Sequence, residues 1–228
     1  MKTISYISDR KQCRLLKSFP VFLNHKRNAL IEAFGKEKTE IIISSSIESY
    51  PNIVRVLPAF NTPVYDALMS VASKMAALKK GMKAAGIQTE EFVKFNIEQT
   101  RSAAKKVPRV LKKLGGKIYL SNLIRWYLKG VAKSVSANGW PTKLINGRKN
   151  DDYVMSVETR DCQMVAFWES IGEGDIRPYC TFFDFTSAEL LGIGLRQESA
   201  IDSGVCRYCF SRNGKVQWPE SIRKILAE

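Results

Sequence analysis

The chain has 228 residues, of which 45% are hydrophobic and 25% are charged, and these proportions are typical of a soluble globular protein. No apolar run approaches the roughly eighteen residues of a membrane span, so we expect no membrane partner. Charged residues at positions 9–11 come too early for a secretory signal, and we therefore expect a cytoplasmic protein.

The net charge of +14 is the strongest compositional signal, and such a charge suits a nucleic-acid partner. However, the lysines fall on helical stretches such as 79–83 and 112–113. No segment interleaves basic with aromatic residues as a single-strand binding sheet does. We therefore do not expect a nucleic-acid partner, and the positive field suits a small anionic substrate equally well. The sequence leaves the oligomeric state open.

Hydrophobic periodicity predicts helices in the first half of the chain. Residues 21–34 form an amphipathic segment that Gly35 stops, whereas residues 45–58 are expected to be a loop or a short strand. The clearest helix starts at Pro63, and Gly81 with Gly86 is expected to end it. Its N-cap is Asn61 or Thr62, and its expected buried stripe is Val64, Leu68, Val71, Met75 and Leu78.

Three further helical segments follow, at residues 89–97, 110–114 and 121–137. Pro108 separates the first two, and Gly115 with Gly116 is expected to break the pattern after the second. The third helix is expected to be capped by Ser121, to end at Asn138 and Gly139, and to face inward with Leu123, Ile124, Tyr127, Leu128, Val131 and Val135.

The pattern changes to period two after an expected loop at residues 140–152. It predicts a strand at 153–158, a helix opened by Asp161 and Cys162, and a helix that Pro178 starts. Strands at 194–199 and 205–211 follow, joined by a turn at 202–204. We therefore predict a single α+β domain over residues 1–228. Its helical layer covers about 1–147, and an antiparallel sheet with the candidate site covers about 148–215.

Five cysteines and a single histidine, His25, limit the possible chemistry. A Ser-His-Asp triad or a His-rich metal centre would depend on that one histidine, which is far from the cysteines of the last third. Cys180 and Asp184 are four residues apart, so a helix would place them on one face as candidate catalytic residues. The alternative interpretation is that each cysteine is ordinary core packing.

The remaining candidates are expected to bind the substrate. Arg196 and Glu198 alternate onto one strand face, as a clamp and its orienting carboxylate would, or as a surface ion pair would. Strand alternation and helix spacing can aim this face at the pocket of Cys180 and Asp184. Cys162 follows the expected helix cap Asp161, a position where the helix dipole favours a thiolate. Cys206 and Cys209 form a Cys-x-x-Cys whose members diverge along a strand, so we expect no disulfide, metal or cofactor.

Four segments of the last third carry a resemblance. Residues 158–162 end in a cysteine, residues 180–184 have the spacing Cys-x-x-x-Asp, and residues 195–201 and 204–210 follow. Together these segments resemble the L-2-amino-thiazoline-4-carboxylic acid hydrolase family, over roughly residues 150–212. The family's closing Cys-Asp-Phe corresponds either to Cys206, with Arg207 in place of the aspartate, or to Cys209, which directly precedes Phe210. Ser199 stands where the family usually has threonine.

The resemblance implies hydrolytic opening of a cyclic amidine (thiazoline) carboxylate to an N-carbamoyl-cysteine-type product. We hypothesise that Asp184 activates water or holds the protonated amidine, that Cys180 is an alternative nucleophile, and that Arg196 binds the substrate carboxylate. One competing function is a non-catalytic small-molecule binding or sensor domain of the same fold. Another is a zinc or nucleic-acid interaction module.

Overall fold

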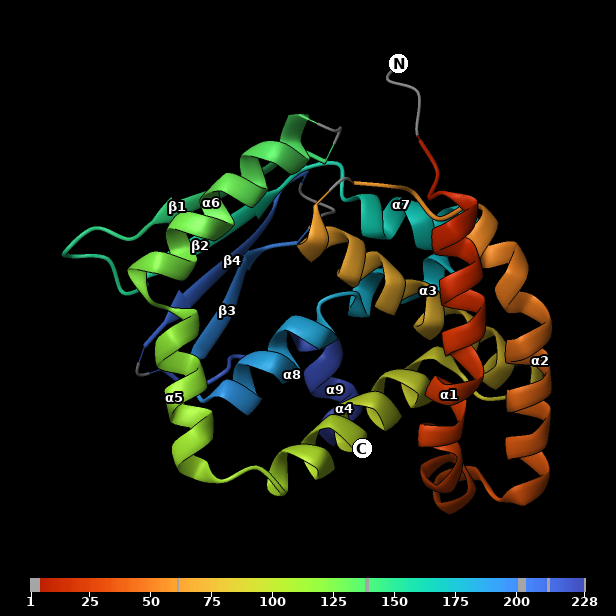
Figure 1. The fold of residues 1–228 in the computed structure, drawn as a ribbon. Coiled ribbons are helices and arrows are strands. Elements are labelled where there is room, and N and C mark those ends of the chain that lie inside the picture. Colours follow the sequence, from red (N-terminus) through yellow and green to blue (C-terminus); the bar gives the residue numbers. More distant parts are fainter. Residues whose placement is uncertain (1–4, 61, 138–139, 201–203, 213, 228) are drawn as a thin grey trace. The chain divides into compact units, whose positions relative to one another are not determined.

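The computed structural model describes residues 5–60, 62–137, 140–200, 204–212 and 214–227 (Figure 1). Helices dominate the N-terminal half and an antiparallel sheet lies in the C-terminal part, which confirms the predicted α+β class. The chain divides into two compact units. Unit 1 comprises Met1–Phe95 and Met164–Arg177, and unit 2 comprises Asn96–Gln163 and Pro178–Glu228. The single domain stays a prediction, because compactness does not test independent folding.

Unit 1 is helical, and capping residues set several of its boundaries. Gly35 ends the first helix with φ 81°, a conformation that glycine adopts readily. Thr62 accepts a hydrogen bond from the backbone N–H of Tyr65 and so caps the helix that begins at Pro63, as predicted. The main helices are α1 (Asp9–Phe34), α2 (Lys36–Arg55), α3 (Pro63–Ala84) and the first half of α4 (Thr89–Lys105), with most of α7 (Gln163–Ser170) and of the 3₁₀-helix η1 (Gly174–Tyr179).

Three predictions for unit 1 are wrong. Residues 45–58 lie largely in helix α2, because its packing against α3 overrides the weak helix propensity of its isoleucine and serine runs. The expected stripe of α3 is buried only at Met75 and Leu78. Leu68 and Val71 are exposed, and the small residues of α3 allow close helix packing instead. The helix also continues through Gly81.

The interior of unit 1 contains a buried lysine. The Lys79 side chain is 2% exposed, and its Nζ lies 2.5 Å from an oxygen of the buried Glu173 and 2.7 Å from an oxygen of Asp175. Thr89 donates a further hydrogen bond to Asp175. Burying a charged side chain is unfavourable unless opposite charges lie close to it. The ion pairs of Lys79 therefore hold the loop between α7 and η1 against helix α3.

Replacing Lys79 with methionine is expected to destabilise the protein by about 3–5 kcal/mol, because it leaves the Glu173 carboxylate buried without its nearest cation. Chemical denaturation measures the change. Lys80→Met is the control, since Lys80 is partly exposed and lies 3.4 Å from Glu173, and it should cost about 1 kcal/mol or less. Equal losses in the two variants would contradict the assigned role of Lys79.

Unit 2 combines a four-stranded antiparallel sheet with helices. The strand order is β1-β2-β4-β3, and Figure 1 shows α6 lying along the sheet beside β1, and α8 beside β3 and α5. Leu144, Met155, Leu195 and Phe210 point from the strands into one core with Phe185 of α8. The elements are α5 (Arg109–Tyr119), α6 (Asn122–Ala137), β1 (Thr142–Asn146), β2 (Met155–Thr159), α8 (Phe182–Leu191), β3 (Gly194–Ser199), β4 (Cys206–Ser211) and α9 (Glu220–Ala227).

The structure corrects several boundaries in unit 2. Strand β1 lies where a loop was expected and moves the start of the sheet to residue 142. Gly115 and Gly116 are inside α5 rather than at a break. Ser121 caps α6 through the N–H of Ile124, as predicted, although two of the residues expected inside are exposed. The predicted stop at 138–139 and most of the predicted turn at 202–204 lie outside the described residues. Within the described ranges, no helix combines the length and apolarity needed to cross a membrane.

Candidate functional site

The two faces of the sheet in unit 2 separate the candidate residues into two groups. On β4, Tyr208 and Phe210 pack into the core with Phe185, so Cys206, two residues before Tyr208, faces the same side. We call this side the core face. The opposite, outer face carries Arg207 and Cys209 of the same strand. The Cys-x-x-Cys motif is therefore divided between the faces, as strand alternation predicts.

Cys180 and Asp184 do not share an α-helix, contrary to the prediction. Pro178 lies inside η1 and starts no α-helix. Cys180 follows in a turn, and Asp184 occupies the first turn of α8, which begins at Phe182. The backbone N–H of Asp184 donates to the carbonyl of Thr181. The change of helix type between the two residues removes the four-residue spacing on which the prediction depended.

Cys180 and Asp184 nevertheless share one neighbour, Tyr208, with which both interact electrostatically. The pKa of Tyr208 is raised well above its ordinary value by burial first, and then by electrostatic interaction with Asp184, Cys206 and Cys180. Cys162 and Asp184 likewise act on Cys206. We call Cys162, Cys180, Asp184, Cys206 and Tyr208 the thiol–carboxyl cluster. The structure thus brings together four of the seven residues selected from the sequence.

Asp184 is the titratable centre of this cluster. Its side chain is reached by solvent, yet the surrounding protein desolvates the carboxyl and raises its pKa to about 6. Within the described part of the chain, no hydrogen bond or ion pair engages this carboxyl. A carboxyl of this kind exchanges protons with water near neutral pH and can accept or donate a proton in a reaction.

The thiol and phenol on β4 are held in their neutral forms. Burial raises the pKa of the Cys206 thiol to about 11, although hydrogen bonds with Tyr208 and Gln197 oppose the shift. The Gln197 amide donates to the Cys206 sulfur over 3.6 Å. Because a thiol rather than a thiolate is present at neutral pH, Cys206 contributes polarity and shape to the cluster but is not a nucleophile.

Arg196 and Glu198 lie on the outer face, in an ion network with Asp152 and Arg207. The Arg196 guanidinium binds both oxygens of Asp152, at 2.8 and 2.9 Å, and an oxygen of Glu198 at 2.7 Å. The second Glu198 oxygen lies 3.1 Å from Nε of Arg207. Hydrogen bonds to Asp152 and Glu198 raise the pKa of Arg196 further above its ordinary value.

This placement corrects the expected shared pocket. Since side chains alternate along β3, Gln197 reaches Cys206 on the core face, while Arg196 and Glu198 face away from the thiol–carboxyl cluster. Cys209 is also on the outer face and interacts with Glu198. Burial, followed by Glu198, raises its thiol pKa to about 11. The surface ion pair considered as the alternative is therefore the arrangement that the structure has.

Sequence reasoning missed Tyr208, Gln197 and Asp152. Tyr208 and Gln197 could have been found by applying strand alternation from Cys206, because a residue two positions along a strand shares its face. No sequence signal indicated Asp152, which precedes β2 and meets Arg196 only through the fold. Thr181 was also missed: its side chain is buried beside Cys180, and its hydroxyl has no hydrogen-bond partner among the described residues.

Further observations bear on metal and redox chemistry. All five cysteines lie in the described ranges, and no disulfide joins any of them. Among the residues that the structure describes, no group of three or more histidine, cysteine, aspartate or glutamate side chains is arranged to hold a metal ion.

Comparison of the chain with protein-family models, curated proteins and solved structures finds no match.

Asp184→Asn is expected to change how stability depends on pH. Because the folded pKa lies above the ordinary 3.8, folding favours the protonated carboxyl, and wild-type stability falls as pH rises from about 4 to about 6. The asparagine variant cannot ionise, so it should be more stable than the wild type at about pH 7.5 and similar to it at about pH 4. Thermal unfolding across this range, with the exposed Glu48→Gln as control, measures the effect. A gain in the stability of Asp184→Asn that does not depend on pH would contradict the raised pKa of Asp184.

Cysteine alkylation should follow burial and thiol pKa. With pKa values of about 11, roughly one in three thousand Cys206 and Cys209 side chains is a thiolate at about pH 7.5. Mass spectrometry of the native protein treated with iodoacetamide is expected to find the exposed Cys13 labelled, and Cys206 and Cys209 unlabelled until denaturant is added. Labelling of Cys206 at the rate of Cys13 would contradict the described burial.

Proposed function

We propose that unit 2 is a hydrolase that opens a cyclic amidine of the thiazoline carboxylate type, with Asp184 as the proton-transferring carboxyl. The observation that carries the proposal is the pKa of about 6 of a solvent-reached carboxyl placed among thiols and a phenol. The resemblance of residues 150–212 to the L-2-amino-thiazoline-4-carboxylic acid hydrolase family supports the choice of substrate class.

The chemistry requires one base and little acid assistance. Asp184 takes a proton from a water molecule as the water oxygen bonds to the amidine carbon. The bond between that carbon and the ring sulfur then breaks, and its electron pair leaves on the sulfur. The protonated Asp184 returns the proton to the thiolate, so the carboxyl is regenerated and one water has been added to the substrate.

Substrate recognition differs from the sequence-based hypothesis. The protonated amidine is a cation, and the Asp184 carboxylate attracts it without help from Arg196. Cys162 and Cys180 are partly exposed, and Cys162 and Asp184 both interact electrostatically with the buried Cys206. Arg196 is paired with Asp152 and Glu198, and Glu198 is also paired with Arg207, so Arg196 and Glu198 have no part in this version of the site.

A non-catalytic binding or sensor domain is the second candidate function. The same carboxylate would hold a cationic amidine without activating water, and the neutral Cys206 and Tyr208 would shape the site. The two functions differ in one observable, which is the release of the ring sulfur as a thiol.

Purified protein is expected to convert 2-amino-thiazoline-4-carboxylate with release of one thiol per turnover, followed by a thiol-reactive dye and by mass spectrometry of the product. Asp184→Asn should lower turnover by about 10² or more, because asparagine cannot accept a proton. Wild-type kcat/KM should rise as pH increases through about 6, where the carboxyl ionises.

Two further variants distinguish a water nucleophile from a thiol nucleophile and provide a control. Cys180→Ser should retain turnover within roughly tenfold if water is the nucleophile, whereas a covalent thiol route would lose nearly all of it. Arg196→Ala is the matched control on the outer face and should stay within about threefold of the wild type. Binding without thiol release would favour the sensor function, and failure to bind would contradict both functions.

A further inference from the structure

Helices α5 and α6 of unit 2, with the residues just before them, expose many large apolar side chains. Of the 17 large hydrophobic residues that the described chain exposes, eight lie within residues 107–127. Val110 and Trp126 are each 75% exposed and Leu123 is 72% exposed. We call this cluster the α5–α6 surface, and it consists of Val107, Val110, Leu111, Leu114, Ile118, Leu123, Trp126 and Tyr127.

Glycine packing explains why the apolar side of α5 faces outward. A Cβ added at Gly116 would lie 2.4 Å from the backbone oxygen of Leu191, so only glycine permits this approach of α5 to α8. At 100° per residue, Val110, Leu114 and Ile118 project from the side of α5 opposite Gly116. The close contact therefore turns the apolar side toward solvent, although apolar exposure of this extent usually marks an interaction site.

The longer stretch that contains both helices carries nearly all of the net charge of the protein. Residues 101–150 contain 13 lysines and arginines and no aspartate or glutamate, while the net charge of the whole chain is +14. At the same spacing, Lys117 and then Lys113 lie next to the apolar side of α5, at its edge near Val110. Basic side chains thus border the exposed hydrophobic residues of this helix.

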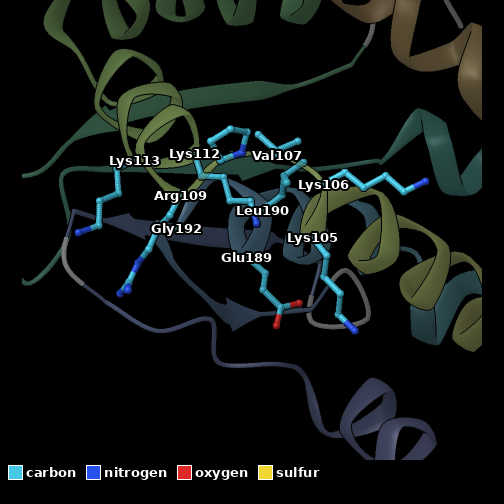
Figure 2. A pocket seen from close by; sticks show the side chains of 10 residues that line it. Lys105, Lys106, Val107, Arg109, Lys112, Lys113, Glu189, Leu190 and Gly192 are labelled. Carbon is cyan, nitrogen blue, oxygen red and sulfur yellow. The ribbon is translucent and has the colours of Figure 1, made fainter.

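A hollow of about 670 Å³ opens beside the N-terminus of α5. Lys105, Lys106, Arg109, Lys112 and Lys113 line it, and Figure 2 shows several of these long side chains extending outward around it. Its one acidic residue is Glu189, whose carboxylate is paired with Arg101 at 2.8 Å. The lining therefore keeps an excess of positive charge that an anionic group would neutralise.

We propose that the α5–α6 surface docks unit 2 on a lipid membrane with anionic headgroups. Apolar side chains with exposed tryptophan and tyrosine, bordered by lysines, are the combination that binds in the interface between headgroups and acyl chains. The lysine stems extend along the apolar layer while their ammonium groups reach the headgroup phosphates and carboxylates. Docking of this kind lies on the membrane surface and needs no spanning helix.

The charge distribution and the aliphatic side chains distinguish this partner from others. If a second copy of the chain bound through the same surface, the lysines of the two copies would face and repel each other. A nucleic acid would neutralise the lysines and could stack on Trp126 and Tyr127, but it would leave the six aliphatic side chains of the surface in water. An anionic lipid surface satisfies both the charge and the apolar exposure.

Co-sedimentation with vesicles tests the proposal. The full chain is expected to bind vesicles of phosphatidylcholine with roughly one third phosphatidylserine at least about tenfold more tightly than vesicles of phosphatidylcholine alone, and salt should weaken the binding. Trp126 emission should shift to the blue on binding, because its ring leaves water, and Trp126→Phe should remove most of that shift.

Paired variants separate the two contributions. Leu111→Ser with Leu114→Ser should weaken vesicle binding about tenfold or more, whereas the exposed Leu68→Ser with Val71→Ser on α3 should not. Lys113→Glu with Lys117→Glu should have a similar effect, and Lys36→Glu with Lys38→Glu, which alters net charge equally on exposed sites elsewhere, should change binding much less. None of these residues belongs to the thiol–carboxyl cluster, so thiol release should be unchanged.

Three results would overturn the proposal. The first is equal binding to both kinds of vesicle, and the second is unchanged binding by the Leu111→Ser and Leu114→Ser variant. The third is preferential binding of a single-stranded oligonucleotide that the leucine substitutions do not weaken, which would identify the surface as an electrostatic nucleic-acid site.

Discussion

The alternation of side chains along β4 is the constraint on which the rest of unit 2 depends. Tyr208 and Phe210 must face the core because they pack with Phe185, and this fixes Cys206 on the same side and Cys209 on the other. The register with β3 then sends Arg196 to the outer face and Gln197 to the core face. The packing of Tyr208 and Phe210 on the core face therefore determines which candidate residues lie close enough to act together.

The two faces shift the pKa values of their carboxyl groups in opposite directions. On the core face, burial favours neutral forms, so the Cys206 thiol and the Tyr208 phenol stay protonated and the Asp184 carboxyl is shifted toward protonation. On the outer face, the charges of Arg196 and Glu198 stabilise each other, and the pKa of Glu198 is lowered. A carboxyl that titrates near neutral pH belongs to the first environment, and a fixed ion network belongs to the second.

Local signals in the sequence were enough for the fold class and for several helix ends. The Thr62 cap, the Gly35 stop and the Ser121 cap act within a few residues, so they could be predicted. Helix α2, strand β1 and the outward side of α5 depend on contacts with distant segments, such as the approach of Gly116 to Leu191. For the same reason the sequence placed Cys180 and Asp184 on one helix, whereas Cys180 lies in a turn and Asp184 in α8. It also assigned Arg196 to a pocket that the register excludes.

The buried Lys79 has a consequence for how the chain is synthesised. Lys79 and Glu173 are 94 positions apart, and the intervening Asn96–Gln163 belongs to unit 2. While the ribosome is still translating that insertion, the ammonium group has no carboxylate to pair with, and enclosing it would carry an uncompensated desolvation cost. The first three helices of unit 1 can therefore form early during synthesis. Lys79 becomes buried between them only after residues 173–175 have left the ribosome.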